Sequence, residues 1–378
     1  MKPDQPVDIY FVPYKRHLQL LFQSLSDESA VAVATSATVA SSIPKGVTID
    51  RCRLHSFGLQ WLLRWLGRSV LAPTAISGLG AALKQRRPHT IVFFDLYHFY
   101  SLQVWWYRWR HPGVRLVCYS ETRRLPRGVI LRPLFRILLR QLRHVDLVLT
   151  YTEDGKDFLQ PYAGAVPVRV VPVPVDTDKF RMMETRSYLP EGVLRILINA
   201  KYEGLKRHGD LFAAVRSLMK NHPSICVSCI SRDGSNEESI RQQAAAAGVA
   251  DAVQFLPPVA TAAEMAEVYA QHDVLVLPSE REAIGMVVPE AMAGGLVTVT
   301  SSAVGANVYV LPEETGFIFP VRSVPALAAC LERLTDPALV RQLGMAGADH
   351  IQAHYQPATV VATLRRGLQQ IDTQQHTN

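Results

Sequence analysis

Short runs of apolar residues alternate with longer amphipathic stretches along almost the whole chain. This alternation is typical of βαβ units, in which each buried parallel strand is followed by a helix that packs on the sheet. It predicts an α/β protein with parallel sheets. Strands are expected at residues 7–12, 30–35, 90–94, 114–119, 146–150, 194–199, 225–230, 253–256, 273–277 and 297–300, and helices at 262–271 and 287–294 among others.

The alternation is interrupted near residues 172–192, where Pro172, Pro174, Pro190 and Gly192 break the periodicity. Such a segment is typical of a linker between domains. The 378 residues also exceed one ordinary core, because domains average about 150 residues. We therefore expect two doubly wound domains. Their bounds are predicted as an N-terminal domain 1–172, a linker 173–192, a C-terminal domain 193–355, and a final helix and tail 356–378 that packs back on the N-terminal domain.

The segment 278–295 is the richest in candidate functional residues. It leaves a buried strand and enters a helix through Gly285, with Glu282 before the turn and Glu290 eight positions later. That spacing would bring both carboxylates to one face, where they could accept hydrogen bonds from sugar and ribose hydroxyls. The N–H groups at such a helix start also suit a phosphate or a sugar hydroxyl; they belong to Ile284, Gly285, Met286 and Val287. The alternative is that both glutamates only favour the helix N-terminus electrostatically.

A second cluster, residues 199–210, follows the first strand of the C-terminal domain. Lys201 and Lys206 lie five positions apart in this loop. Open α/β sheets bind ligands beyond the carboxyl ends of their strands, and an ammonium group is suited to a diphosphate. The alternative is a solvated basic loop.

The segment 278–295 resembles the signature of retaining GT-B glycosyltransferases of the family 4 type, Glu-x7-Glu followed by Ala-Met-Ala-x-Gly. The resemblance covers nearly all of residues 146–320, because further spaced elements occur in the expected order. These are residues 170–176 with Phe180, 253–256, 264–271, 273–279, 304–307 and 315–320. It implies a GT-B fold, two Rossmann-like domains that face a cleft, and transfer of a sugar from a nucleotide-sugar with retention of configuration.

The resemblance also implies roles for these residues. Lys201 and Lys206 would neutralise the diphosphate leaving group, Glu282 would orient the sugar, and Glu290 would hold the ribose. Relatives usually carry Arg at the first lysine position, so Lys201 keeps the charge without the guanidinium fork.

The N-terminal domain departs from the family pattern. Residues 13–17 replace the usual glycine-rich loop after the first strand. Relatives often have a histidine near the transferred sugar, where this chain has Glu121. Glu121 is expected to take a catalytic or acceptor-binding role there, or to pair structurally with Arg123 or Arg124. His98 is a second candidate, whose alternative is a packing histidine at a strand end.

Charge is distributed unevenly along the chain. Residues 1–190 carry 26 Lys and Arg against 14 Asp and Glu, whereas residues 191–378 carry 14 against 19. The basic half contains arginine-rich helices expected at 61–68 and 131–143, with three tryptophans between them, and basic faces beside apolar ones are typical of interfacial helices. We expect the stripe of Arg132, Arg136, Arg140 and Arg143 to contact anionic lipid. The alternative is a solvated basic surface.

Several classes of protein are disfavoured. Five scattered cysteines and no signal-peptide pattern favour a reducing cytoplasm. No apolar run approaches the roughly 18 residues of a membrane span. Cys226 and Cys229 have metal-like spacing, but no second cysteine pair exists and the histidines form no ligand cluster, so we expect no metal and no cofactor. A dinucleotide-binding glycine motif and a nucleic-acid recognition module are also lacking.

The sequence therefore predicts a metal-independent glycosyltransferase. Its acceptor would be a glycan or a lipid-linked glycan in cell-envelope or polysaccharide biosynthesis, and it would work in the cytoplasm or on the cytoplasmic face of the membrane. Two alternatives remain, a nucleotide-sugar 2-epimerase of GT-B shape and a non-enzymatic membrane-docking scaffold.

Overall fold

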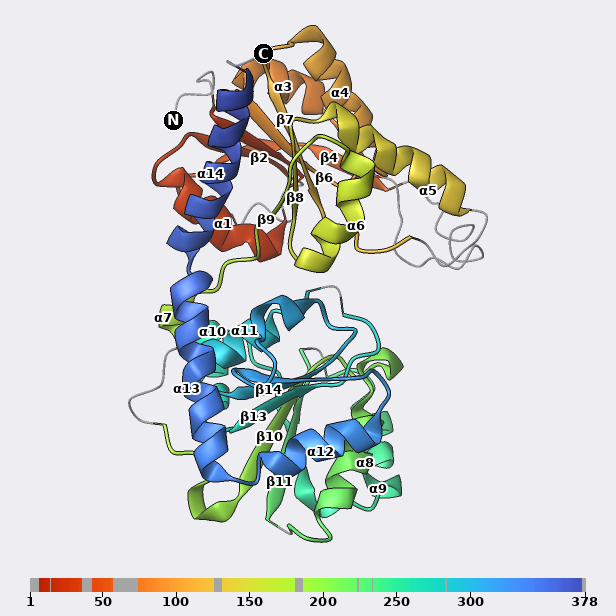
Figure 1. Cartoon of the computed structure of the whole chain (residues 1–378), viewed down its shortest axis with the longest axis vertical. Coiled ribbons are helices and arrows are strands. Elements are labelled where there is room, and N and C mark those ends of the chain that lie inside the picture. The colour runs from red at the N-terminus through yellow and green to blue at the C-terminus, as the bar shows by residue number, and fades with distance from the viewer. Residues whose placement is uncertain are drawn as a thin grey trace. The chain divides into compact units, whose positions relative to one another are not determined.

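The computed structural model divides the chain into two compact units (Figure 1). It describes residues 7–13, 15–35, 43–56, 74–125, 131–180, 186–222, 224–232, 234–282 and 284–375. Unit 1 comprises residues 1–174 and 357–378, and unit 2 comprises residues 175–356. The α/β prediction is confirmed in both units.

Unit 1 is built on a seven-stranded parallel sheet of order β3-β2-β1-β6-β7-β8-β9. The chain moves outward from β1 to β3, crosses to β6 and then moves the other way, so the topological switch point lies between β1 and β6. The strands are β1 (Ile9–Val12), β2 (Val31–Thr35), β3 (Thr48–Arg51), β6 (Thr90–Phe94), β7 (Arg115–Ser120), β8 (Leu147–Thr150) and β9 (Val168–Val170). An antiparallel pair, β4 (Arg53–Ser56) and β5 (Thr74–Ser77), forms a separate small sheet.

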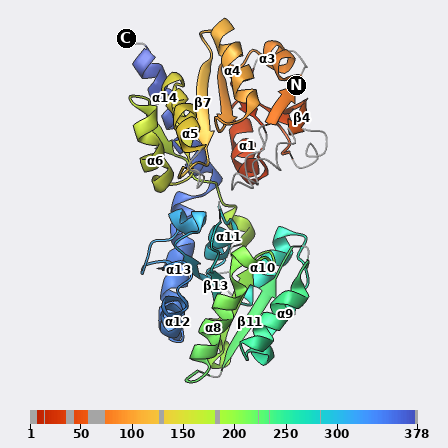
Figure 2. The ribbon, with the colours of Figure 1, turned by 90° about the vertical axis from the view of Figure 1, so that its right-hand side faces the viewer.

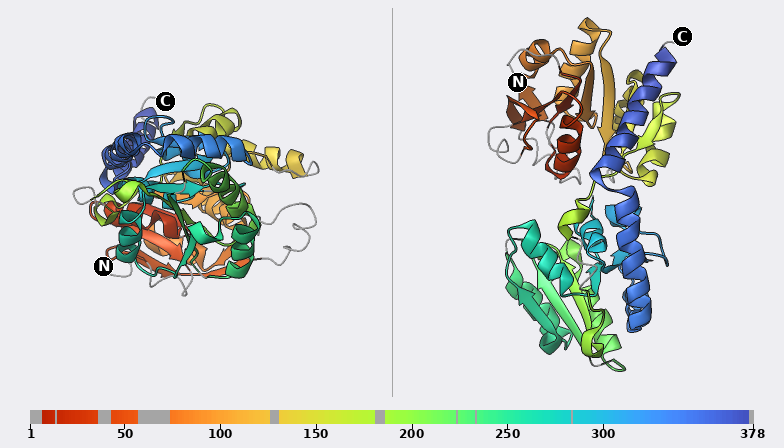
Figure 3. Two further views of the ribbon diagram at one scale, coloured as in Figure 1. Left: turned by 90° about the horizontal axis from the view of Figure 1, so that it is seen from below. Right: turned by 90° about the vertical axis from the view of Figure 1, so that its left-hand side faces the viewer.

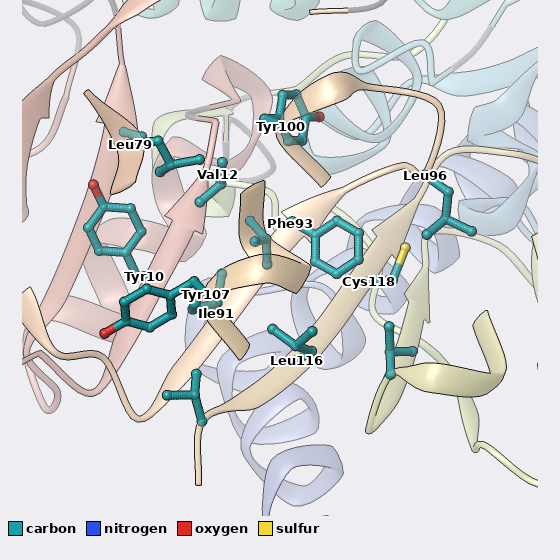
Figure 4. Close-up of a cluster of buried hydrophobic side chains, with 14 of the residues drawn as sticks. Tyr10, Val12, Leu79, Ile91, Phe93, Leu96, Tyr100, Tyr107, Leu116 and Cys118 are labelled. Atoms are coloured by element: carbon teal, nitrogen blue, oxygen red, sulfur yellow. The ribbon is translucent and has the colours of Figure 1, made fainter. Parts of the chain in front are cut away.

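Alternate side chains of the unit 1 strands point to opposite faces of the sheet, and both faces are covered. On one face, Tyr10, Phe93 and Cys118 pack against helices α3 to α6 (Figure 4). On the other face, α1 and α14 lie side by side (Figure 3). The helices are α1 (Gln19–Ser26), α3 (Leu79–Arg86), α4 (Phe99–Arg110), α5 (Leu131–Arg140), α6 (Glu153–Ala163) and α14 (Pro357–Gln375), with 3-10 turns η1 (Arg16–Leu18) and η3 (Gln141–His144).

Unit 2 contains a six-stranded parallel sheet of order β12-β11-β10-β13-β14-β15, with its switch point between β10 and β13. Helices α8 and α9 cover one face and α10 and α11 the other (Figure 2). The strands are β10 (Leu194–Asn199), β11 (Ile225–Ile230), β12 (Val253–Leu256), β13 (Val274–Leu277), β14 (Val297–Ser301) and β15 (Gly316–Phe319). The helices are α7 (Thr177–Phe180), α8 (His208–Leu218), α9 (Glu237–Ala246), α10 (Ala262–Ala270), α11 (Val287–Ala293), α12 (Val324–Arg333) and α13 (Pro337–His354), with 3-10 turns η5 (Pro190–Gly192), η6 (Gly204–Lys206), η7 (Ala250–Ala252) and η8 (Gly305–Tyr309).

The structure corrects one helix prediction and leaves another untested. The helix expected at 131–143 ends at Arg140, and Arg143 lies in the 3-10 turn η3. The helix expected at 61–68 lies outside the described residues. Among the helices that are described, none has the length and apolar character to cross a bilayer.

Candidate active site

Three loops meet at the carboxyl edge of the unit 2 sheet, beside its switch point. The N–H of Glu280, after β13, donates to the carbonyl of Leu205, after β10, at 2.7 Å. The backbone of Glu282 is tied to the loop after β14, because its N–H donates to Ala303 at 3.3 Å and its carbonyl accepts from Gly305 at 3.0 Å. These bonds fix the backbone from which the Glu282 side chain extends.

The same edge brings Lys206 and Glu282 together. The ammonium of Lys206, at the end of η6, forms an ion pair with the Glu282 carboxylate. The two side chains are 14% and 22% exposed, so the pair is shielded from bulk water yet reachable by a ligand. A cation and an acceptor held this close suit a ligand that carries both an anionic and a hydroxyl group.

Gly285 is required beside this pair. Its φ is +83°, a left-handed value that residues with a Cβ rarely adopt. A Cβ there would also lie 3.0 Å from Cγ of Glu282 and 3.4 Å from Cδ2 of Leu277. A side chain at position 285 would therefore press against Glu282.

The helical spacing expected for Glu282 and Glu290 is wrong. Helix α11 begins at Val287, so Glu282 lies before it, in a strand-like bridge with Val304. Glu290 lies inside α11, and its Oε2 accepts from the hydroxyl of Tyr269 in α10 at 3.2 Å. Glu282 thus pairs with Lys206 and Glu290 with Tyr269, in different surroundings.

Glu290 is the carboxyl group most affected by its surroundings in this unit. Burial raises its pKa from 4.5 to about 7, and the hydrogen bond from Tyr269 only partly opposes this effect. The carboxyl therefore changes charge near neutral pH. Burial likewise raises the pKa of Tyr269, which keeps its phenol protonated as a donor.

The four residues expected to bind the donor through their N–H groups form the turn into α11. They are half-buried: Ile284, Gly285, Met286 and Val287. The carbonyls of Gly285 and Met286 already accept from Val288 at 3.0 Å and Glu290 at 3.2 Å, which starts the helix.

Lys201 differs from Lys206. Its side chain is 60% exposed, and its ammonium lies 3.9 Å from Oε1 of Glu203 on the same loop. Of the two lysines expected to hold a diphosphate, Lys206 is the one that the structure joins to Glu282.

Unit 1 has a polar cluster at the carboxyl edge of its own sheet. Glu121, after β7, accepts a hydrogen bond from Nζ of Lys15 at 3.4 Å, and Nε2 of His17 lies 3.8 Å from the same Oε1. Nε2 of His17 also lies 3.0 Å from the hydroxyl of Tyr151. Burial, aided by Lys15, lowers the pKa of His17 to about 4, so this imidazole is neutral at physiological pH.

Asp95 holds the loop that carries Glu121. It follows β6 with a left-handed φ of +56° and is 1% exposed. Its carboxylate accepts from Ser120 Oγ at 2.7 Å, Tyr97 Oη at 3.0 Å and the N–H of Glu121 at 3.2 Å. Burial, and next the charge of Glu121, raise the pKa of Asp95, whereas these hydroxyl donors lower it.

Sequence reasoning missed Lys15 as the partner of Glu121 and missed His17, Asp95 and Tyr151 as cluster members. A signal was available, because Lys15, Asp95 and Glu121 each follow a predicted strand, and carboxyl ends of parallel strands share one edge. The alternative for Glu121 was a structural pairing with Arg123 or Arg124. Burial lowers the pKa of Arg123, whereas the charges of Asp154 and Glu121 raise it.

His98 has the surroundings of a packing histidine. It precedes α4, its Nδ1 accepts from the N–H of Thr74 at 3.3 Å, and its ring stacks on Tyr100 at 4.7 Å. Burial lowers its pKa to about 4.

The arginine stripe is partly as expected. Arg132, Arg136 and Arg140 are exposed on α5, whose opposite face buries Phe135. Arg143 is also exposed, but it lies beyond α5 in η3, and its Nε donates to the carbonyl of Tyr162 at 3.3 Å.

No group of three or more His, Cys, Asp or Glu side chains able to hold a metal occurs within the described ranges. Cys226 and Cys229 both lie in β11 as free thiols.

The chain is similar to curated glycosyltransferases. The chain is 29% identical to a D-inositol 3-phosphate glycosyltransferase of Streptomyces bingchenggensis (strain BCW-1), over 70% of this chain and 64% of that protein. It is 30% identical to the enzyme of that name from Streptomyces avermitilis, over 54% of this chain and 48% of that protein. The chain thus spans about half to two thirds of the length of these relatives.

Solved structures show the same fold along the whole chain. Sucrose-phosphate synthase from Thermosynechococcus elongatus superposes with a TM-score of 0.72 at 20% identity, covering 98% of this chain and 99% of that one. HepE of Anabaena, solved with UDP and glucose, superposes with a TM-score of 0.66 at 15% identity, covering 96% and 100%.

Residues 185–348 match the family model of glycosyl transferases group 1. This range contains Lys206, Glu282 and Glu290. The chain therefore has the GT-B fold, and residues 185–348 of its second unit are similar to the glycosyl transferases group 1.

Proposed function

We propose that the chain transfers a sugar from a nucleoside diphosphate sugar to a hydroxyl acceptor, with retention of configuration. The observation that carries this proposal is the pairing of Lys206 with Glu282 at the switch point of the group 1 domain. The proposal gives each group a role. Lys206 binds the diphosphate, assisted by Lys201, while Glu282 orients the sugar and Glu290 accepts from the ribose. The turn 284–287 binds phosphate or sugar hydroxyls through its N–H groups.

The proposed reaction develops negative charge on the diphosphate, where the ammonium of Lys206 can neutralise it. The bond between the anomeric carbon and the diphosphate oxygen breaks, and its electron pair leaves with the diphosphate. The acceptor hydroxyl oxygen bonds to the same carbon, and its proton passes to the departing phosphate oxygen. Fixed positive charge aimed at a developing anion is among the largest catalytic effects. We propose that lysine ammonium groups supply this charge without a metal.

UDP-sugars are the first donors to test, because HepE structures contain UDP and UDP-glucose. For the acceptor we propose a glycan or a lipid-linked glycan in envelope or polysaccharide biosynthesis. Glu121 with Lys15 would contact it in a catalytic or binding role. Inositol phosphate belongs in the same panel because of the names of the curated relatives. We place the reaction in the cytoplasm, with peripheral attachment to the membrane through the arginine stripe.

A thermal-shift panel of UDP- and GDP-sugars tests the donor. A ligand at about 100 times its Kd stabilises the protein by roughly 2.7 kcal/mol, which gives a readable shift. The thermal midpoint of the wild type should rise with sugars of one nucleotide, either UDP or GDP, and that of Lys206→Ala should not rise with either. Product formation with chelator present should match that without it. Restoration of a chelated enzyme by Mg²⁺ or Mn²⁺ would contradict the metal-independent mechanism, and no response to any nucleotide would favour the scaffold alternative.

A further inference from the structure

Helix α4 carries a row of large apolar side chains that face away from the core of unit 1. Trp109 is 76% exposed, Leu102 59%, Trp106 52% and Phe99 44%. Their spacing of three, four and three residues places them on one stripe of the helix. Trp105 lies outside this row, because it packs against the core cluster.

A basic pocket lies at the end of the same helix. It has a volume of about 960 Å³ and is formed by the last turns of α3 and α4 and the segments that lead into β6 and β7. Lys84, Arg87, Arg110 and His111 line it beside Tyr107. None of its lining residues, all within the described part of the chain, is acidic. It lies at the amino ends of these strands, whereas Glu121 lies at the carboxyl edge.

Arg110 belongs to both features. It lines the pocket, and its guanidinium carbon lies 3.7 Å from the centroid of the Trp106 ring. Basic side chains in a last helical turn are favoured by the helix dipole, which accounts for part of this charge. The dipole does not account for two exposed tryptophans beside it.

The positive charge of this region favours an anionic partner over a second copy of the chain. Residues 51–143 contain 17 Lys and Arg against Asp95 and Glu121 alone, and the sequence of α4 has no acidic residue. Two copies of such a surface would repel each other. Tryptophan and arginine together are favoured where an apolar phase meets anionic headgroups.

We propose that α4 docks on an anionic phospholipid bilayer. Trp106, Trp109 and Leu102 enter the boundary between headgroups and acyl chains, and the basic pocket binds a lipid phosphate through Lys84, Arg87 and Arg110. This inference deepens the peripheral attachment proposed above and is independent of glycosyl transfer. It adds an apolar contribution, so part of the binding persists in high salt.

Sedimentation with vesicles tests the contribution of the apolar row on α4. We expect wild type to bind vesicles of phosphatidylcholine with phosphatidylglycerol, and brominated acyl chains to quench its tryptophan fluorescence. In Trp106→Ala/Trp109→Ala the partition coefficient should fall at least about tenfold and the quenching should largely disappear. Met345→Ala, which truncates a 41% exposed side chain in unit 2, is the matched control and should bind as wild type does.

The pocket is tested by charge reversal. In Lys84→Glu/Arg87→Glu/Arg110→Glu the preference for phosphatidylglycerol over phosphatidylcholine alone should fall, because only the arginines of α5 remain to supply it, whereas Lys220→Glu/Arg341→Glu in unit 2 should keep the full preference. Nucleotide-induced thermal shifts should be unchanged in every variant, which separates this test from that of the proposed function.

Three results would overturn the proposal: unchanged vesicle binding by the tryptophan variant, a wild-type dimer in solution that this variant dissociates, or an undiminished preference for anionic lipid in the pocket variant. A pocket that binds inorganic phosphate while wild type ignores vesicles would also overturn it, because the site would then serve a soluble anion.

Discussion

The ammonium of Lys206 is paired with the carboxylate of Glu282, although 76 positions separate them in the chain. The pair joins the loop after β10 to the loop after β13, on the two sides of the switch point. A bound diphosphate would compete with Glu282 for Lys206 and leave the carboxylate available for a sugar hydroxyl. The pair therefore occupies the positions that the donor is proposed to take.

Glu282→Ala should abolish sugar transfer without unfolding the protein, because the side chain is partly exposed and its backbone bonds remain. A fall in kcat of about 100-fold or more is expected for the loss of a group that positions the reacting sugar. Turnover and the thermal midpoint are the two measurements. Unchanged turnover would remove Glu282 from the site.

Lys201→Ala/Lys206→Ala should weaken binding of a nucleoside diphosphate more than binding of the nucleoside, because the lost contacts are to phosphate. Calorimetric titration of both ligands measures the difference. We expect Lys206→Ala alone to give most of the loss, since Lys201 is the more exposed of the two. Equal losses for both ligands would place these lysines away from the diphosphate.

Gly285→Ala should reduce turnover more than it reduces the stability of the fold. The new Cβ would meet Glu282 at 3.0 Å and would require a φ of +83°. A stability loss of about 1–2 kcal/mol is expected from the left-handed backbone alone, with a larger loss of turnover. Gly204→Ala is the matched control, because nothing lies within 4 Å of a Cβ built there. Equal turnover in the two variants would show that Gly285 does not hold Glu282 in place.

Glu290 should make stability depend on pH. Its pKa is about 7 in the folded protein and 4.5 unperturbed, so its contribution to stability is fully present below about pH 4.5 and is lost as the pH rises through 7. Glu290→Gln, which cannot ionise, should therefore gain stability relative to wild type between pH 5 and pH 8. The gain is on the order of 3 kcal/mol. Urea unfolding at both pH values measures it, and a difference that is independent of pH would contradict the raised pKa.

Buried parallel strands were predictable to the residue. The expected ranges 90–94, 194–199 and 225–230 coincide with the central strands β6, β10 and β11. Central strands are covered on both faces, so their sequences are continuous apolar runs. The range 253–256 coincides with the edge strand β12, whose sequence Val-Gln-Phe-Leu is still mostly apolar. Strand β3 was missed because its sequence, Thr-Ile-Asp-Arg, has a single apolar residue.

The site was predictable in its residue types and less so in its contacts. Lys206 and Glu282 were found from motif spacing, but the spacing of Glu282 and Glu290 suggested a shared helix face that does not exist. The pair of Lys15 and Glu121 spans 106 positions and depends on strand order, which periodicity does not reveal.

The arginine stripe of α5 should give electrostatic attachment to membranes. Arg132, Arg136 and Arg140 are exposed and belong to the half of the chain that carries the excess of basic side chains. Each basic side chain near an anionic leaflet contributes about 1 kcal/mol, screened over about 8 Å at physiological ionic strength. Changing the three to Glu should weaken binding to anionic vesicles at low salt, with the contribution of α4 remaining, and should leave nucleotide binding intact, because donor binding is assigned to unit 2. If wild type ignores anionic vesicles even at low salt, the stripe is a solvated surface and the acceptor is a soluble glycan or small molecule.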